Sequence, residues 1–212
     1  MSGPPGRDRL LDAAERLFAE QGIDATSARA INAAADLSPA ALHYHFGNKE
    51  KLVEEVLYRR LDTLNERRAA MLAAPASQDR QIDGYGLAEL LVLPLSEFAL
   101  EKGVAGQWYI RFLSRLYNEK AATMVGLIEA NFAQGVRIYD EMVHAAAPHL
   151  DLAEARRRRV LAGETATHGV AHIAEMVYDR TDGGSAVAPL IRSLVAFIAG
   201  GLTASLSPAD RS

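Results

Sequence analysis

The chain has 212 residues, 49% of them hydrophobic, with 23 Lys and Arg against 27 Asp and Glu and a net charge of −4. This length allows one large domain, or a small module joined to a larger one. The absence of cysteine excludes disulfides, thiol nucleophiles and thiolate metal sites, and the acidic balance by itself argues against a nucleic-acid partner. There is no signal peptide pattern and no run of about 18–20 apolar residues, so we expect a soluble, cytoplasmic protein that does not contact a membrane.

Three short helices are predicted first. An amphipathic pattern covers residues 8–21, and a second, shorter one covers residues 23–35. After a break, Ser38 is followed by Pro39, an N-cap with proline in the first helical turn, and this predicts a third helix that ends at Gly47.

Longer helices are predicted in the rest of the chain. One covers residues 49–74, and a polar loop with Pro, Ser, Asp and Gly occupies residues 75–86. Apolar periodicity then predicts helices over residues 87–102, 105–117, 120–146, 151–179 and about 187–206. No alternating strand pattern occurs, so we predict an all-α fold with an N-terminal unit at 1–48, a linking helix at 49–74 and a larger C-terminal helical bundle at 75–212.

The second and third helices have the outline of a helix-turn-helix. On an ideal third helix, Leu42 and Phe46 share one face, which we expect to point inward. Four of the remaining positions carry two alanines, an imidazole and a phenol, which suit close approach to a DNA major groove, whereas His45 could equally be a packing residue. These positions are Ala40, Ala41, His43 and Tyr44.

Other DNA contacts are expected near this helix. Thr26 and Ser27 offer hydroxyls and free amides to a phosphate, Arg29 is the best candidate to bind guanine, and Lys49 is a cation at a helix start, where a phosphate partner would explain it. Residues 1–52 nevertheless have six basic and seven acidic side chains, a net charge of −1. We therefore expect modest affinity from one module and a clear dependence on salt.

The stretch from about residue 9 to 57 resembles the N-terminal domain of TetR/AcrR-type transcriptional regulators. The resemblance is carried by LLDAAERLFAEQGIDATSARAINAAADLSPAALHYHFGNKEKLVEEVL, although the family usually has glycine where this chain has Asp36. It implies a helix-turn-helix that binds a double-stranded DNA operator, and a dimeric regulator, expected to be a repressor, that responds to a small effector. The DNA contacts that it implies are Thr26, Ser27, Arg29, Ser38, Pro39, Ala40, Ala41, His43, Tyr44 and Lys49.

The resemblance also implies an effector pocket in the C-terminal bundle. Seven of the 14 aromatic residues fall between residues 98 and 142, a concentration that indicates either core packing or a largely apolar binding cavity. The expected pocket residues are Phe98, Trp108, Tyr109, Phe112, Met124, Phe132, Tyr139, His168 and His172.

A row of polar side chains follows one face of a later helix. Glu164, His168, His172 and Glu175 could form a polar pocket wall, a dimer contact or a divalent metal site. The metal alternative would favour a metal-dependent enzyme over a DNA-binding regulator. We expect no cofactor, no bound metal and no catalysis, since no nucleophilic set stands out.

The last two helices carry apolar stripes that predict a four-helix dimer interface. Two DNA-binding units spaced by one DNA turn, about 34–36 Å, could then bind a palindrome together, which offsets the weak basicity of each. The expected interface residues are Val170, Ile173, Leu190, Leu194, Ile198 and Leu202.

Overall fold

The computed structural model describes residues 5–77, 82–178 and 187–206, and these ranges contain helices and no strand. The helices are α1 (Pro5–Gln21), α2 (Ala28–Ala34), α3 (Ala41–Phe46), α4 (Lys49–Ser77), α5 (Gly84–Glu101), α6 (Val104–Ala146), α7 (Leu152–Tyr178) and α8 (Val187–Thr203). The predicted all-α class is confirmed. Within the described ranges, no helix combines the length and the apolar character that crossing a bilayer requires.

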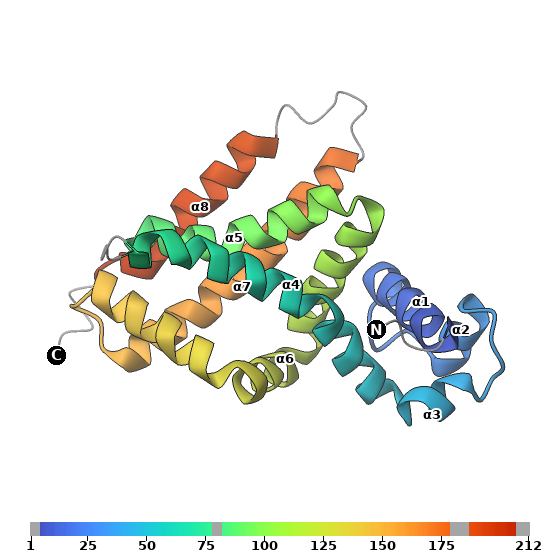
Figure 1. Ribbon diagram of the computed structural model, residues 1–212. Helices are drawn as coiled ribbons and strands as arrows, with labels where there is room; N and C mark the ends of the chain where they lie inside the picture. The colour runs from blue at the N-terminus through green and yellow to red at the C-terminus, as the bar shows by residue number, and fades with distance from the viewer. Residues whose placement is uncertain (1–4, 78–81, 179–186, 207–212) are drawn as a thin grey trace.

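Figure 1 shows two groups of helices. The helices α1–α3 form a small group at one end, α4 leads away from it, and α5–α8 form the larger bundle. The small group has its own core, in which Leu10, Phe18, Ile31, Leu42 and Phe46 are buried. The first turns of α4 close this core with further apolar side chains.

Helix α6 is a single helix of 43 residues, so the prediction of two helices, 105–117 and 120–146, separated near Asn118, is wrong. Asparagine in a helix interior costs less than about 1 kcal/mol relative to alanine, which tertiary packing readily offsets. Here α6 packs along α7, where Asn118 Oδ1 lies 3.0 Å from His168 Nε2. Leu116, almost opposite on the helix, is fully buried.

The predicted loop at 75–86 is shorter than expected. Helix α4 continues to Ser77, and α5 begins at Gly84 because the Asp83 carboxylate accepts the backbone N–H of Gly86 at 2.9 Å. Residues 78–81 lie outside the described part of the chain.

The two groups of helices contact each other through α6. The Phe18 ring of α1 stacks on Phe112 of α6 with 5.9 Å between ring centroids. Next to this pair, the Tyr109 hydroxyl of α6 donates to the Leu57 carbonyl of α4 at 2.7 Å. These buried contacts connect the small N-terminal group directly with the bundle.

Candidate DNA-binding surface and ligand cavity

A buried asparagine fixes the turn between α2 and α3. The Asn32 amide donates to the Pro39 carbonyl at 2.7 Å, and its Oδ1 accepts the Leu42 N–H at 2.9 Å. Within the same turn, Asp36 adopts a left-handed conformation with φ of 52°, which glycine adopts at no steric cost. Arg9 offsets part of the cost of this backbone conformation, because its guanidinium donates to the carbonyl and the carboxylate of Asp36, both at 3.0 Å.

Helix α3 presents the predicted face, with one exception. Leu42 and Phe46 point inward, while Ala40, His43 and Tyr44 are exposed, and Tyr44 retains 85% of its accessible surface. The expectation that Ala41 is exposed is wrong: it is 9% exposed and packs in the core. Helix α3 begins two residues later than predicted, after a turn in which the Ala41 N–H donates to the Ser38 carbonyl at 3.0 Å. Ala41 is one 100° step from the buried Leu42, so it borders the inward face, where its small side chain is covered.

Thr26 does not offer its hydroxyl to a ligand. It is 1% exposed, and the hydroxyl contacts the Gly22 and Leu17 carbonyls at 2.6 and 3.3 Å. The second helix accordingly starts after residue 27, where Ser27 caps it by accepting the Ala30 N–H at 3.1 Å. The predicted start at residue 23 is too early, because these hydroxyl bonds stabilise a turn instead.

The position of Lys49 at the start of α4 is explained by contacts within the chain. Its ammonium donates to the Ile23 carbonyl at 2.9 Å and the Thr26 carbonyl at 3.1 Å. These neutral acceptors account for a cation at the start of α4, so no phosphate is needed to explain it. Arg29, in contrast, is exposed and has no ion-pair partner among the described residues.

The exposed part of the predicted DNA-binding set is therefore smaller than expected. Its members come from the start of α2, the turn and α3, and DNA contact by them stays a prediction. It comprises Ser27, Arg29, Ser38, Pro39, Ala40, His43 and Tyr44.

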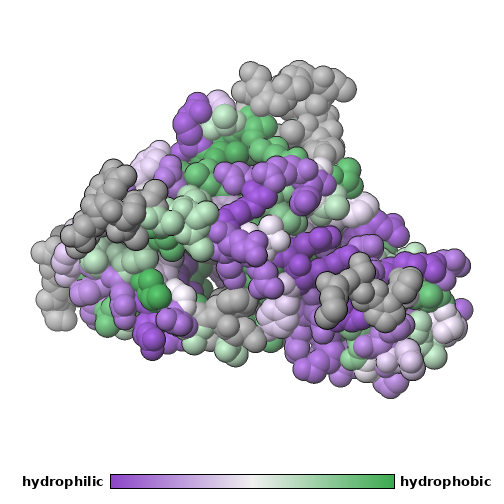
Figure 2. Space-filling model, viewed as in Figure 1, coloured by the Kyte–Doolittle hydropathy of each residue, from purple (hydrophilic) through white to green (hydrophobic). Residues whose placement is uncertain are grey.

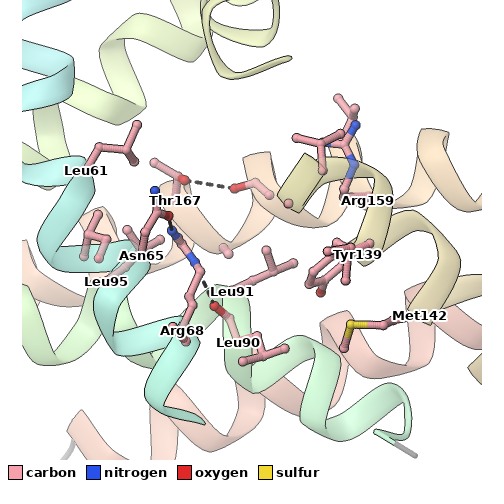
Figure 3. A pocket seen from close by; sticks show the side chains of 18 of the residues that line it. Leu61, Asn65, Arg68, Leu90, Leu91, Leu95, Tyr139, Met142, Arg159 and Thr167 are labelled. Carbon is pink, nitrogen blue, oxygen red and sulfur yellow. Dashed lines mark hydrogen bonds between the residues drawn. The ribbon is translucent and has the colours of Figure 1, made fainter. Parts of the chain in front are cut away.

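A cavity of about 580 Å³ lies between α4, α5, α6 and α7. This volume is within the range of about 300–1,000 Å³ that small-molecule sites occupy. Figure 3 shows Arg68, Leu90, Tyr139 and Met142 around the same space. Leucines form much of the wall, namely Leu61, Leu64 and Leu72 of α4 with Leu90, Leu91 and Leu95 of α5.

Polar groups in the cavity wall are few. Arg68 donates from Nε to the Leu90 carbonyl at 3.2 Å and from a terminal nitrogen to Asn65 Oδ1 at 2.9 Å. The Tyr139 hydroxyl donates to the Leu87 carbonyl at 2.6 Å, and burial raises the pKa of Tyr139 above its ordinary value, so the ring stays neutral. Arg159 is paired with Asp140 at 2.6 Å.

Of the aromatic residues that the sequence assigns to a pocket, only Tyr139 lines this cavity among those described. Phe98, Tyr109 and Phe112 form a buried cluster instead, with ring centroids 5.6 and 6.1 Å apart, and Trp108 is half-buried outside the wall. The buried cluster therefore belongs to the core, where Phe112 contacts α1 and Tyr109 contacts α4. Core packing was one of the two interpretations of the aromatic concentration, the other being a binding cavity. The side chains of Met124 and Phe132 lie outside the described part of the structure.

The row formed by Glu164, His168, His172 and Glu175 does not come together as a set of metal ligands among the described residues. His168 lies within hydrogen-bond distance of Asn118 and of the Glu164 carbonyl, His172 is exposed, and Glu175 pairs with Arg111 at 3.1 Å. Neither histidine lines the cavity, which corrects their assignment to it. No group of three or more His, Asp or Glu suited to a metal occurs among the described residues.

Comparison with family models decides the family. Residues 10–56 match the bacterial regulatory proteins of the tetR family, and residues 89–201 match the tetracyclin repressor-like C-terminal domain. The chain belongs to the TetR family. It is therefore a transcriptional regulator with a helix-turn-helix DNA-binding domain, and not an enzyme.

Relatives and solved structures agree with this family. The transcriptional repressor KstR2 of Rhodococcus jostii is 30% identical over 141 residues, 63% of this chain and 69% of that protein. The structure of the ketosteroid transcriptional regulator KstR2 of Mycobacterium tuberculosis matches with a TM-score of 0.56 and 24% identity over 94% of this chain and 95% of that one. The fatty acid degradation regulator FadR from Bacillus halodurans matches with a TM-score of 0.60 and 18% identity over 95% and 98%. At these identities, the structural likeness concerns the TetR-type fold.

Most of the predicted interface stripe of this TetR family member is inside the protomer. Val170, Ile173, Ile198 and Leu202 are between 1% and 8% exposed, because α7 and α8 pack on each other and α5 covers α8. These four residues are therefore not free to contact a second chain. Leu190 and Leu194 are half-buried.

Proposed function

We propose that the protein is a homodimeric, ligand-responsive repressor that binds a palindromic operator and is released from it by a small, largely apolar effector. One observation carries this proposal: α4 begins directly after α3, contacts it, and continues into the wall of the cavity. Binding to an operator would place the protein in the cytoplasm of a bacterium, where the chromosome is accessible.

Helix α4 supplies a direct path between the two sites. Lys49 fastens its first residue to the loop before α2, and Arg68 of the same helix lies in the cavity wall. The 19 intervening steps correspond to about 28 Å of helix at 1.5 Å per residue. An effector that shifts α4 would therefore move the α2–α3 unit and change the spacing of two such units in a dimer.

A second connection runs through α6. The Asp24 N–H, in the loop before α2, donates to the Glu119 carboxylate at 2.9 Å, and the Asp24 carboxylate pairs with Lys120 at 2.9 Å. Because α6 also lines the cavity, these bonds tie the DNA-binding unit to a second wall of it.

The dimer would use the outer face of α8 rather than the stripe that the sequence indicates. Phe197 is 72% exposed, and Cβ atoms added at Gly200 or Gly201 would meet nothing within 4 Å. Leu161 of α7 is 62% exposed. Figure 2 shows hydrophobic surface gathered over the α8 end of the bundle. Such a face supports close packing against a second copy.

The test is operator binding by purified protein to DNA selected from a random pool. Tyr44→Ala should weaken binding at least about tenfold, because it removes an exposed contact of the size that carries binding energy at interfaces. Tyr85→Ala is the matched control, since Tyr85 is also exposed, at 46%, but lies on α5. Equal operator affinity of wild type and Tyr44→Ala would contradict the proposed surface.

A further inference from the structure

Arg68 is a guanidinium inside an apolar cavity without a carboxylate partner. Its hydrogen bonds go to two neutral oxygens, the Leu90 carbonyl and Asn65 Oδ1, as the dashed lines in Figure 3 show. Among the described residues, no carboxylate lies within 4.0 Å of it, and no Asp or Glu lines the cavity. A guanidinium has five N–H donors, so donors remain for a ligand.

Other arginines nearby are neutralised by the protein itself. Arg67, the preceding residue on α4, pairs with Glu97 and Glu101 on the outside of the bundle. Arg159, the other arginine in the cavity wall, pairs with Asp140. Arg68 is thus the one arginine in the described cavity wall whose charge no carboxylate of the described chain balances.

Burial of such a charge is unfavourable unless a partner balances it. Desolvation lowers the pKa of Arg68, but a guanidinium remains protonated at neutral pH. Tyr117 and Tyr139 line the cavity with Arg68, and burial raises the pKa of both hydroxyls, so neither supplies a negative charge. The cavity wall therefore carries a positive charge among mostly apolar side chains.

We propose that Arg68 binds the carboxylate of the effector, which makes the effector class a monocarboxylic acid with an apolar body. This inference rests on the proposed function, in which the cavity holds the effector. A carboxylate accepts two parallel N–H bonds from a guanidinium and balances a single positive charge. A phosphomonoester carries nearly two negative charges, of which Arg68 balances only one, since Arg159 is already paired. The leucine walls bury the apolar body.

Three probes with the same ten-carbon chain test the assignment: decanoate, 1-decanol and decyl phosphate. Their affinities are measured by calorimetric titration in the absence of DNA, for wild type, Arg68→Met and Arg67→Met. Methionine retains most of the side-chain length and removes the charge. Arg67→Met is the matched control, because it removes a neighbouring guanidinium that does not line the cavity.

We expect wild type to bind decanoate at least about tenfold more tightly than 1-decanol. The reason is that a charge-assisted hydrogen bond contributes more binding free energy than a neutral one, by an amount that corresponds to about this ratio of affinities. Arg68→Met should abolish this preference, and Arg67→Met should retain it. Equal affinities for acid and alcohol in wild type, a preference that survives in Arg68→Met, or no binding of any probe would overturn the proposal. Tighter binding of decyl phosphate would overturn the monocarboxylate assignment.

The outcome is separable from that of the proposed function. If Arg68→Met does not fold, the comparison of the three probes on wild type decides alone. Addition of decanoate to the protein–operator complex is a separate measurement: if decanoate binds through Arg68 and the operator stays bound, the effector response fails while the anion site stands. Conversely, if a neutral ligand releases the operator and wild type shows no preference for decanoate, the effector response stands while the anion site fails.

Discussion

The Asn32 side chain holds the α2–α3 turn in a way that one substitution can test. Pro39 has no N–H and its carbonyl can only accept, while the Leu42 amide can only donate. Asn32 satisfies both at once, at 2.7 and 2.9 Å, and is itself 2% exposed. Asn32→Ala removes both bonds from the segment that positions the exposed face of α3.

The expected loss of stability depends on whether the Leu42 N–H and the Pro39 carbonyl can reach water once the Asn32 side chain is removed. Leu42 is 3% exposed, so its amide has no access to water, and an unsatisfied buried donor costs about 1–3 kcal/mol. Pro39 is exposed, so its carbonyl can bind water and adds at most about 1 kcal/mol. We therefore expect Asn32→Ala to lower the free energy of unfolding by about 1–4 kcal/mol, or the thermal midpoint by roughly 2–16 °C.

Urea and thermal unfolding followed by circular dichroism measure this loss, and operator affinity should fall with it because α3 loses its support. Ser38→Ala is the control in the same turn: its side chain is exposed and caps no helix, so a change within about 0.5 kcal/mol is expected. Asn32→Ala unfolding within 0.5 kcal/mol of wild type would refute the reasoning about the turn.

Two further predictions concern the bundle. Phe197→Asp should convert a dimer into a folded monomer in size-exclusion chromatography with light scattering. The Phe197 ring is exposed in one chain, so the new charge should disturb only contacts with a second copy. An unchanged mass would exclude this face of α8 as the interface. Hydrogen bonds from Arg158 and then Arg157 lower the pKa of Glu154, so the stability they add is present above the ordinary carboxyl pKa of 4.5 and is lost as pH falls through the lowered value. The unfolding free-energy difference between wild type and Glu154→Gln should therefore be largest near pH 7 and shrink below about pH 4.5, and a pH-independent difference in urea titrations would contradict it.

Local periodicity determined the helix-turn-helix outline and the direction of some of its side chains. The 100° step per residue places Leu42 and Phe46 together, and the structure buries both and exposes Tyr44. The same periodicity places Arg68 on the face of α4 that carries Leu61 and Leu72, so a charged residue on an apolar face was the signal by which sequence alone could have located the cavity.

Tertiary structure decided which helix covers each face. Periodicity identifies an apolar stripe but not its partner, so Ile198 and Leu202 were indistinguishable from an interface until α5 and α7 were seen to cover them. The same holds for Phe112, which packs against α1 rather than lining a pocket. The sequence alone therefore determined the helical class and the inward position of Leu42 and Phe46, whereas the helix limits, the cavity, the partners of Lys49 and the free face of α8 depend on contacts between residues far apart in the chain.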